Sequence, residues 1–285
     1  MQNSVTSIIE CVNIHSGRRQ ALYREANRLE APNWSRDGSF LVYNCDGVLY
    51  RLQLDNNKPQ KLDTSFANAN NNDHGISPDG TQLVISHHAA ECDGQSIIYT
   101  LPIGGGNPKQ ITKSGPSYWH GWSPDGKTLA FVAGRGKPSD FDIYTIGVDG
   151  GEEVQLTHTP GLDDGPDYSA DGRYIYFNSY RSGRMQIWRM HSDGTNPQQV
   201  VESPNSDWFP HPSPDGKYLV FLRYLQDQLQ SHPFGRDVQL ILLDLQSRVQ
   251  KPLTEIFWGG QGTINVPSWS PDSQSIAFIS YIKME

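Results

Sequence analysis

Trp122-Ser123-Pro124-Asp125-Gly126 is the fullest of six copies of one phrase that returns along this chain. The repeated serine stands at positions 35, 77, 123, 169, 213 and 270, so successive copies lie 42, 46, 46, 44 and 57 residues apart. Repeats of roughly 40 to 50 residues are typical of the four-stranded blades of a β-propeller. Six copies therefore predict six blades.

The residues inside each copy fit a tight turn between two strands. Proline presets φ at the first corner, aspartate hydrogen-bonds back to the turn, and glycine supplies the positive φ that ends it. An apolar run such as residues 129–132 follows as a second strand, then a third strand and a short fourth one at the edge. We expect one all-β domain over residues 1–285, with antiparallel blades at about 30–65, 72–113, 118–158, 164–202, 208–255, and 265–285 together with 5–24.

The two ends of the chain are predicted to share the last blade. The sixth copy has room for only two strands before the chain ends, whereas residues 7–14 and 20–23 have the pattern of a third and a fourth strand. Pairing the N-terminal strands with the C-terminal one closes the ring and leaves no free sheet edge there.

Composition narrows the partners and the location. The formal net charge is −8, and the sequence has no cluster of Lys and Arg, so we expect no nucleic-acid partner, because such partners need a basic face. The first residues lack a basic end followed by a long apolar run, so we expect neither a signal peptide nor a membrane anchor. Three cysteines without Cys-x-x-Cys spacing indicate reduced thiols and a cytoplasmic protein.

At these repeats the chain resembles the TolB-like β-propellers, whose hallmark is the same Trp-Ser-Pro-Asp-Gly phrase. The resemblance covers nearly the whole chain and implies a six-bladed propeller, a fold that serves interaction proteins, peptidase caps and sugar lyases. TolB itself adds an N-terminal domain and a secretion signal, which we do not expect here. The sequence has no Gly-x-Ser-x-Gly elbow, so peptidase activity is not predicted.

Functional residues are expected where the copies differ. Three positions before the repeated serine, four copies have Pro, whereas two have His74 and His120; one position later, Asp167 and His211 appear. The first strand of each blade lines the channel, so these four side chains are predicted to meet at the mouth opposite the Asp-Gly turns. We predict them as the catalytic residues.

The sharpest hypothesis for this mouth is a divalent metal held by His74, His120 and His211, with Asp167 as a fourth ligand or a hydrogen-bonding partner. The metal would polarise a substrate carboxylate or carbonyl and assist elimination. Oligogalacturonate lyases, which are similar propellers, hold a metal with His and Gln, although their ligand set does not map onto this chain residue by residue. The alternative is that the histidines only line a channel filled with hydrogen-bonded water.

Loops and strand ends around the same mouth are predicted to bind the ligand. Aromatic faces stack on sugar rings and Arg pairs with carboxylates, which suits a small polar ligand such as a carbohydrate derivative, an anionic one included. The candidate binding residues are Asn33, Asp73, Trp119, Asn178, Arg181, Trp208, Arg223, Gln261 and Asn265. The neighbouring acids Asp163 and Asp164 are expected to face water.

Two classes of function remain open from the sequence. The first is binding or processing of a small molecule, and an enzyme of this kind would be a carbohydrate-active lyase or hydrolase. The second is a non-catalytic scaffold that presents the same face, or the insertion at residues 226–236, to a protein partner. A pocket of ligand size would favour the first, and a flat polar rim the second.

Overall fold

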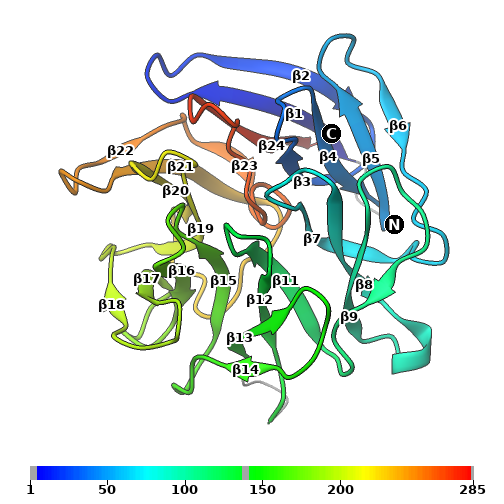
Figure 1. The fold of residues 1–285 in the computed structure, drawn as a ribbon. Helices are drawn as coiled ribbons and strands as arrows, with labels where there is room; N and C mark the ends of the chain where they lie inside the picture. Colours follow the sequence, from blue (N-terminus) through cyan, green and yellow to red (C-terminus); the bar gives the residue numbers. More distant parts are fainter. Residues whose placement is uncertain (1–4, 137–140, 284–285) are drawn as a thin grey trace.

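Six small antiparallel sheets stand around one central axis, as Figure 1 shows. The computed structural model describes residues 5–136 and 141–283. The first sheet contains β3 (Leu29–Trp34), β4 (Phe40–Cys45), β5 (Val48–Gln53) and β6 (Pro59–Lys61). The second contains β7 (Asn70–Ile76), β8 (Gln82–His88), β9 (Ser96–Pro102) and β10 (Lys109–Gln110). The third contains β11 (Ser117–Trp122), β12 (Thr128–Ala133), β13 (Asp142–Gly147) and β14 (Val154–Gln155). A 3₁₀ turn at Ala90–Cys92 separates β8 from β9.

The next two sheets continue around the ring. They contain β15 (Asp163–Tyr168), β16 (Tyr174–Ser179), β17 (Gln186–His191) and β18 (Gln198–Gln199); and β19 (Ser206–Pro212), β20 (Tyr218–Tyr224), β21 (Arg236–Asp244) and β22 (Gln250–Pro252), with β23 (Phe257–Gly259) added beside β21. In these five sheets the strand nearest the axis is the first in sequence, so the predicted six-bladed propeller is confirmed.

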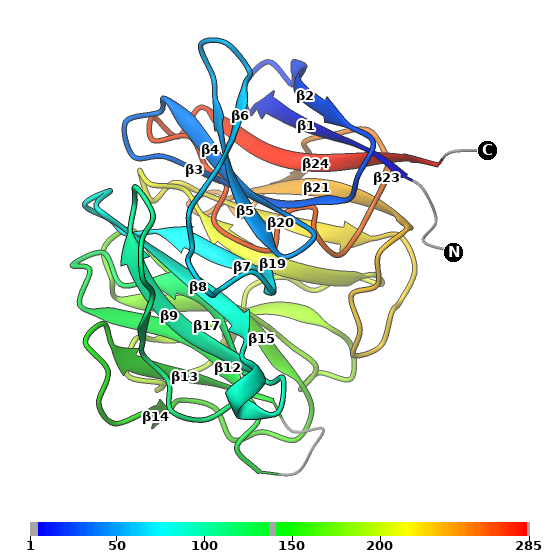
Figure 2. The same cartoon turned by 90° about the vertical axis from the view of Figure 1, so that its right-hand side faces the viewer.

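The sixth sheet joins the two ends of the chain. Its order is β2 (Arg19–Glu25), β1 (Val5–Asn13) and β24 (Ser275–Lys283), with Val5 opposite Lys283 and Asn13 opposite Ser275. Figure 2 shows β1 and β24 running side by side. The predicted closure by N-terminal and C-terminal strands together is therefore confirmed.

This last blade departs from four strands in one respect. Its innermost position holds only an isolated bridge between Trp269 and Ile276. Pro267 and Pro271 flank that bridge, and neither has an N–H group to donate to a ladder. The chain before the bridge, residues 260–265, instead forms a loop whose carbonyls at Ile264 and Asn265 contact the inner-strand residues His211 and His120.

The repeated phrase builds the same turn six times. In every copy the serine hydroxyl donates to the aspartate Oδ1 over 2.6–2.7 Å, and the amide five residues after the serine donates to the serine Oγ. Each turn glycine lies beside the third residue of the preceding copy, as Gly126 does beside Pro78. The first copy has Arg36 there, and its guanidinium donates to the carbonyls of Ile76 and Ser77 in the second blade, each over 3.1 Å.

The core lies between neighbouring blades. In four of the blades a phenylalanine of β12, β16, β20 or β24 is fully buried: Phe131, Phe177, Phe221 and Phe278. Burying such a side chain stabilises the fold by roughly 1.5–3 kcal/mol. Among the described residues, no helix has the length and apolar character to cross a membrane.

Candidate functional site

A β-bulge interrupts the innermost strand of each of the first five blades. The pairing register shifts between Glu30 and Asn33, Asn70 and His74, Trp119 and Gly121, Asp164 and Asp167, and Trp208 and His211. A bulge adds one or more unpaired residues and re-aims the side chains beside it. The bulge therefore changes which side chains of each innermost strand face a given end of the channel.

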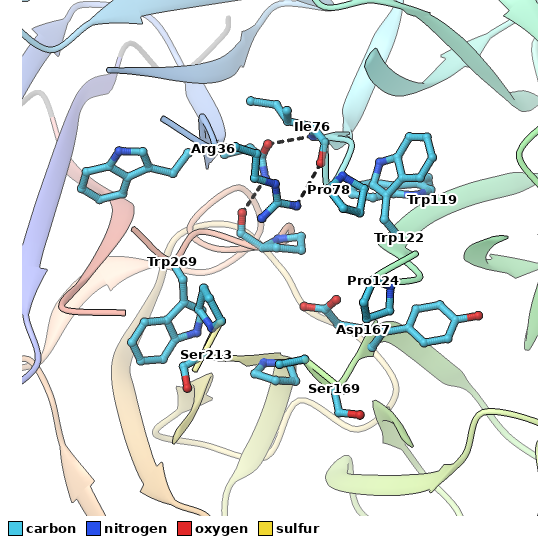
Figure 3. Close-up of a pocket in the computed structure, with 17 residues that line it drawn as sticks. Arg36, Ile76, Pro78, Trp119, Trp122, Pro124, Asp167, Ser169, Ser213 and Trp269 are labelled. Atoms are coloured by element: carbon cyan, nitrogen blue, oxygen red, sulfur yellow. Dashed lines mark hydrogen bonds between the residues drawn. The ribbon is translucent and has the colours of Figure 1, made fainter. Parts of the chain in front are cut away.

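Two cavities occupy those two ends. The smaller one, of about 210 Å³, lies among the Ser-x-Asp-Gly turns and is drawn in Figure 3. It contains the predicted residues Asn33, Trp119 and Asp167, and Arg36 approaches it from the side opposite Asp167.

The larger cavity, of about 630 Å³, opens at the predicted mouth, on the side of the loops between second and third strands. We call it the mouth pocket. Its volume is in the range of small-molecule sites, roughly 300–1,000 Å³. Its lining residues come from every blade except the first: Asn71, Asn72, Asp73, His88, Tyr118, His120, Val132, Phe141, Leu162, Asp164, Phe209, Gln230, His232, Gln261 and Asn265.

His120 is the central polar group of the mouth pocket. Its Nε2 lies 3.2 Å from Asp164 Oδ1, and its Nδ1 lies 3.2 Å from the carbonyl oxygen of Asn265. Its ring stacks on Phe209, with 6.1 Å between centroids. The imidazole is therefore fixed on both nitrogens and on one face, and His120 is only 3% exposed.

The insertion after β20 supplies a second imidazole. His232 Nε2 lies 3.6 Å from Asp164 Oδ2, and its Nδ1 contacts the amide oxygen of Gln261. The rings of Trp208 and Phe209 hold His232 at centroid distances of 4.6 and 5.2 Å. Asp164 thus receives one histidine on each oxygen.

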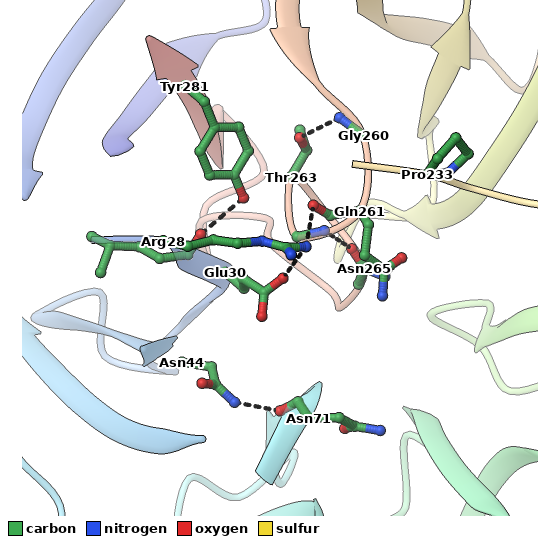
Figure 4. Close-up of polar contacts among 12 residues, drawn as sticks. Arg28, Glu30, Asn44, Asn71, Pro233, Gly260, Gln261, Thr263, Asn265 and Tyr281 are labelled. Atoms are coloured by element: carbon green, nitrogen blue, oxygen red, sulfur yellow. Dashed lines mark hydrogen bonds and ion pairs between the residues drawn. The ribbon is translucent and has the colours of Figure 1, made fainter. Parts of the chain in front are cut away.

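A network of polar contacts fixes the loop at residues 260–265 (Figure 4). Arg28 forms an ion pair with Glu30 over 2.6 Å and also donates to the carbonyl oxygen of Gln261 over 3.4 Å. The amide of Gly262 donates to Asn265 Oδ1 over 2.7 Å, and Asn265 Nδ2 donates to the Gln261 side chain over 3.1 Å. These contacts orient the two predicted ligand-binding amides, Gln261 and Asn265, at the pocket wall.

Burial and charge shift the pKa values in the pocket in opposite directions. Burial is the main reason that the pKa of Asp73 rises to about 7, an effect that the charge of His120 only partly offsets. Burial alone would lower the pKa of His120, but Asp73 and Asp164 outweigh it and raise that pKa to about 9. Although burial opposes it, the hydrogen bond from His120 holds the pKa of Asp164 below its ordinary value. Asp164 and His120 thus form a buried ion pair at neutral pH.

The three-histidine metal site is a correction to the sequence analysis. Both nitrogens of His211 are engaged, Nδ1 with Asp167 at 3.0 Å and Nε2 with the Ile264 carbonyl at 2.7 Å. His74 is fully buried near the Val42 carbonyl, and burial lowers its pKa to about 4. Within residues 5–136 and 141–283, no group of three His, Cys, Asp or Glu is placed to hold a metal ion. His74 and His211 therefore do not join His120 in one site.

Other predicted ligand-binding residues make structural contacts instead, the two arginines within their own blades and Asn178 between two blades. Arg181 pairs with Asp163 over 2.9 Å, and Arg223 pairs with Asp207 through two contacts of 2.7 and 2.9 Å. Asn178 accepts a hydrogen bond from the Phe209 amide over 3.0 Å.

The two tryptophans predicted to stack on a ligand are also core residues. Trp119 and Trp208 are 1% and 0% exposed. The ring of Trp119 fills the space beside Gly75, where an added Cβ would lie 2.0 Å from the indole. Neither indole lines the mouth pocket. Only Asp73, His120, Gln261 and Asn265 of the predicted residues do so.

Sequence reasoning missed Asp164, His232 and Tyr118 as pocket residues. Asp163 and Asp164 were expected to face water but are 1% and 7% exposed, because both lie on β15, the innermost strand of its blade, all of whose residues are buried. The signal for His232 was its place in the long insertion, and that for Tyr118 was its non-repeated aromatic ring two residues before His120.

The structure defines a six-bladed β-propeller that carries a polar pocket at one channel mouth. Residues 119–255 match the model of the TolB beta propeller domain. The uncharacterized protein Atu1656 of Agrobacterium fabrum is 47% identical over 99% of this chain and 94% of its own length. A solved structure from Agrobacterium tumefaciens, described as a candidate TolB, is 46% identical to this chain and has a TM-score of 0.93. The match covers 99% of this chain and 100% of that one. The chain belongs to the TolB-like β-propeller family.

A more distant solved structure shares only the fold. An oligogalacturonate lyase from Vibrio parahaemolyticus is 12% identical, with a TM-score of 0.56, and 98% of each chain is covered.

Proposed function

We propose that the mouth pocket binds a small polar ligand of the size of a sugar derivative. The observation that carries this proposal is the convergence of Asp73, His120, Asp164 and His232 on one cavity of about 630 Å³. The protein-scaffold alternative called for a flat polar rim, whereas these side chains meet inside a concavity. Tyr118, Phe141 and Phe209 add aromatic surface of the kind that stacks on sugar rings.

The test is a thermal-shift screen with neutral, amino and acidic hexoses. A ligand that binds only the native state at about 100 times its Kd raises the free energy of unfolding by about 2.7 kcal/mol. We expect at least one class of hexose to raise the Tm, and Tyr118→Ala to remove that shift. Tyr174→Ala is the control, because Tyr174 begins β16 beside the Ser-x-Asp-Gly turns and does not line the mouth pocket.

The raised pKa values of Asp73 and His120, two neighbouring groups of the mouth pocket, favour a second candidate function, which is proton transfer on the bound sugar. A carboxylate with a pKa of about 7 is suited to act as a base, and an imidazolium with a pKa of about 9 as an acid. Such a pair would serve a lyase or a hydrolase. The test is to incubate the protein with any hexose derivative that shifts its Tm and to follow unsaturated or cleaved products, with Asp73→Asn expected to be inactive.

We also propose a cytoplasmic location, on the ground that Cys11, Cys45 and Cys92 are free thiols. Fractionation of cells into periplasm and cytoplasm, with marker proteins for each, tests this. Recovery of the protein in the periplasmic fraction would contradict it.

A further inference from the structure

The charged groups of the mouth pocket are mainly acidic. Of the lining residues that the structure describes, Asp73 and Asp164 are carboxylates, His120 is the charged base, and none is Lys or Arg. The arginines that would suit an anionic ligand are paired elsewhere, Arg181 with Asp163 and Arg223 with Asp207. Among the described lining residues, therefore, no arginine is available to bind an anionic ligand.

The two carboxylates differ in how well they are satisfied. Asp164 accepts from His120 and from the Gly165 amide, and His232 lies near its other oxygen. The charge of His120 attracts the carboxylate of Asp73, and a hydrogen bond from Asn71 has the smallest effect on the pKa of that carboxyl. Yet Asp73 is only 6% exposed and lines the pocket. A buried carboxylate with unused acceptor capacity is costly unless something else supplies the donors.

Aromatic surface lies close to this carboxylate. Burial is the main reason that the pKa of the Tyr118 hydroxyl is raised, and the nearby negative charges of Asp73 and Asp164 raise it further. The Tyr118 ring lies 6.2 Å from that of Phe141, centroid to centroid. A carboxylate next to aromatic faces is the combination that binds an ammonium group, through charge-assisted hydrogen bonds and cation–π attraction.

The geometry points to a sugar-sized ligand that bears an amine, held by Asp73 and the ring of Tyr118. This inference rests on the proposed function, because it names the class of ligand for the same pocket. An acidic sugar would instead place its carboxylate beside Asp73 and Asp164, and His120, the cation among the described lining residues, already faces Asp164. A neutral sugar would fill the pocket without meeting the acceptor capacity of Asp73.

Three hexoses that share one ring test the charge preference. They are 6-amino-6-deoxyglucose, glucose and glucuronate, which differ only at C6. Calorimetric titration at a mildly alkaline pH, above the pKa of Asp73, keeps both the amine and the carboxylate charged. We expect the amine to bind at least ~10-fold more tightly than glucose, which is the gain of about one charge-assisted hydrogen bond in a buried site, and glucuronate to bind more weakly than glucose.

Asp73→Asn identifies the group responsible. It removes a buried charge without changing shape, so the variant is expected to fold, and its preference for the amine over glucose should fall to within ~3-fold, since a neutral amide gives no charge-assisted bond. Asp237→Asn, an exposed carboxylate at the start of β21, is the matched control and should keep the preference.

The outcomes separate the two proposals. If glucuronate binds as tightly as the amine, or Asp73→Asn keeps the preference, the amine inference is wrong and the sugar-binding proposal stands. If none of the three hexoses binds, the proposed function itself is contradicted for ligands of this size.

Discussion

Asp73 and His120 occupy one pocket and hold protons that an exposed side chain would release. Asp73 keeps its proton to a pH of about 7 and His120 to about 9. In both cases the folded state binds more protons than the unfolded state over an interval of pH. The free energy of unfolding must therefore fall as the pH rises through that interval.

Asp73→Asn should stabilise the protein in a pH-dependent manner. The folded-state pKa lies above the unfolded one, so the stabilisation from the proton on Asp73 is complete below about pH 4 and is lost as the pH rises to about 7. The amide has no proton to lose, so the Tm of the variant should exceed that of the wild type by more at pH 8 than at pH 5. The difference should correspond to roughly 2–4 kcal/mol. Equal Tm differences at both pH values would contradict the shift.

His120→Gln should destabilise the protein, because it leaves the buried Asp164 without its ion-pair partner. Breaking a buried pair from one side costs about 3–5 kcal/mol. The loss should be largest below about pH 6.5, where the wild-type imidazolium contributes fully, and should shrink as the pH rises through about 9. Urea unfolding at pH 6 and pH 9 measures it, with the exposed His158→Gln as the control. A change no larger than that of the control would refute the ion pair.

Residues that break the repeat were only partly predictable as site residues. His74 and His120 replace the proline that is common at their position, and Asp167 and His211 stand at the next position, which varies among the copies. Of the four, only His120 lines the mouth pocket. Which way each of them faces depends on the β-bulge beside it, and a bulge depends on pairing between strands rather than on local sequence.

Two loops from neighbouring blades complete the mouth pocket. The insertion after β20 brings Gln230 and His232, and the loop at residues 260–265 brings Gln261 and Asn265. The first loop was recognised from its length alone. The contacts of its His232 with Trp208 and Gln261 join residues 24 and 29 positions apart, and the sequence of the loop does not predict them.

Gly260→Ala should loosen this pair of loops. The φ of Gly260 is +111°, and a Cβ there would lie 2.2 Å from the Pro233 carbonyl oxygen in the insertion. Strain in the backbone and the clash should together cost about 2 kcal/mol or more, and ligand binding should weaken because His232 moves with Pro233.

Gly183→Ala is the matched control for that change. Gly183 also has a positive φ, +83°, but an added Cβ would meet nothing within 4 Å. Melting curves should show the smaller loss for Gly183→Ala. Equal losses would mean that the contact with Pro233 is unimportant.

The whole ring could be predicted more completely than any single site. Six similar turns at blade spacing fixed the number of sheets, and the strand count fixed the shared last blade. The isolated bridge at Trp269 was not anticipated, because the sixth copy reads like the others apart from Ser273 in place of the turn glycine and the longer segment that precedes it.

Deletion of residues 1–24 should abolish the cooperative unfolding of the whole propeller. It removes β1 and nearly all of β2, so that β24 would keep only its bridge to Trp269 and would become an open edge. Calorimetry should show no wild-type transition, and a peptide of residues 5–25 added in trans should restore it. A truncated protein with an unchanged Tm would contradict the closure.

The pairing of β1 with β24 also limits when the last blade can form during synthesis. β1 is synthesised long before β24, its neighbour on one side, because the paired residues Asn13 and Ser275 are 262 positions apart in the chain. At 5–20 residues per second the interval is roughly 15–55 seconds. During that interval the apolar side chains of Ile9 and Val12, which are fully buried in the folded protein, lack the strand β24 that helps to cover them. The nascent chain is an open arc, and the period before closure is when it is most exposed to aggregation and proteolysis.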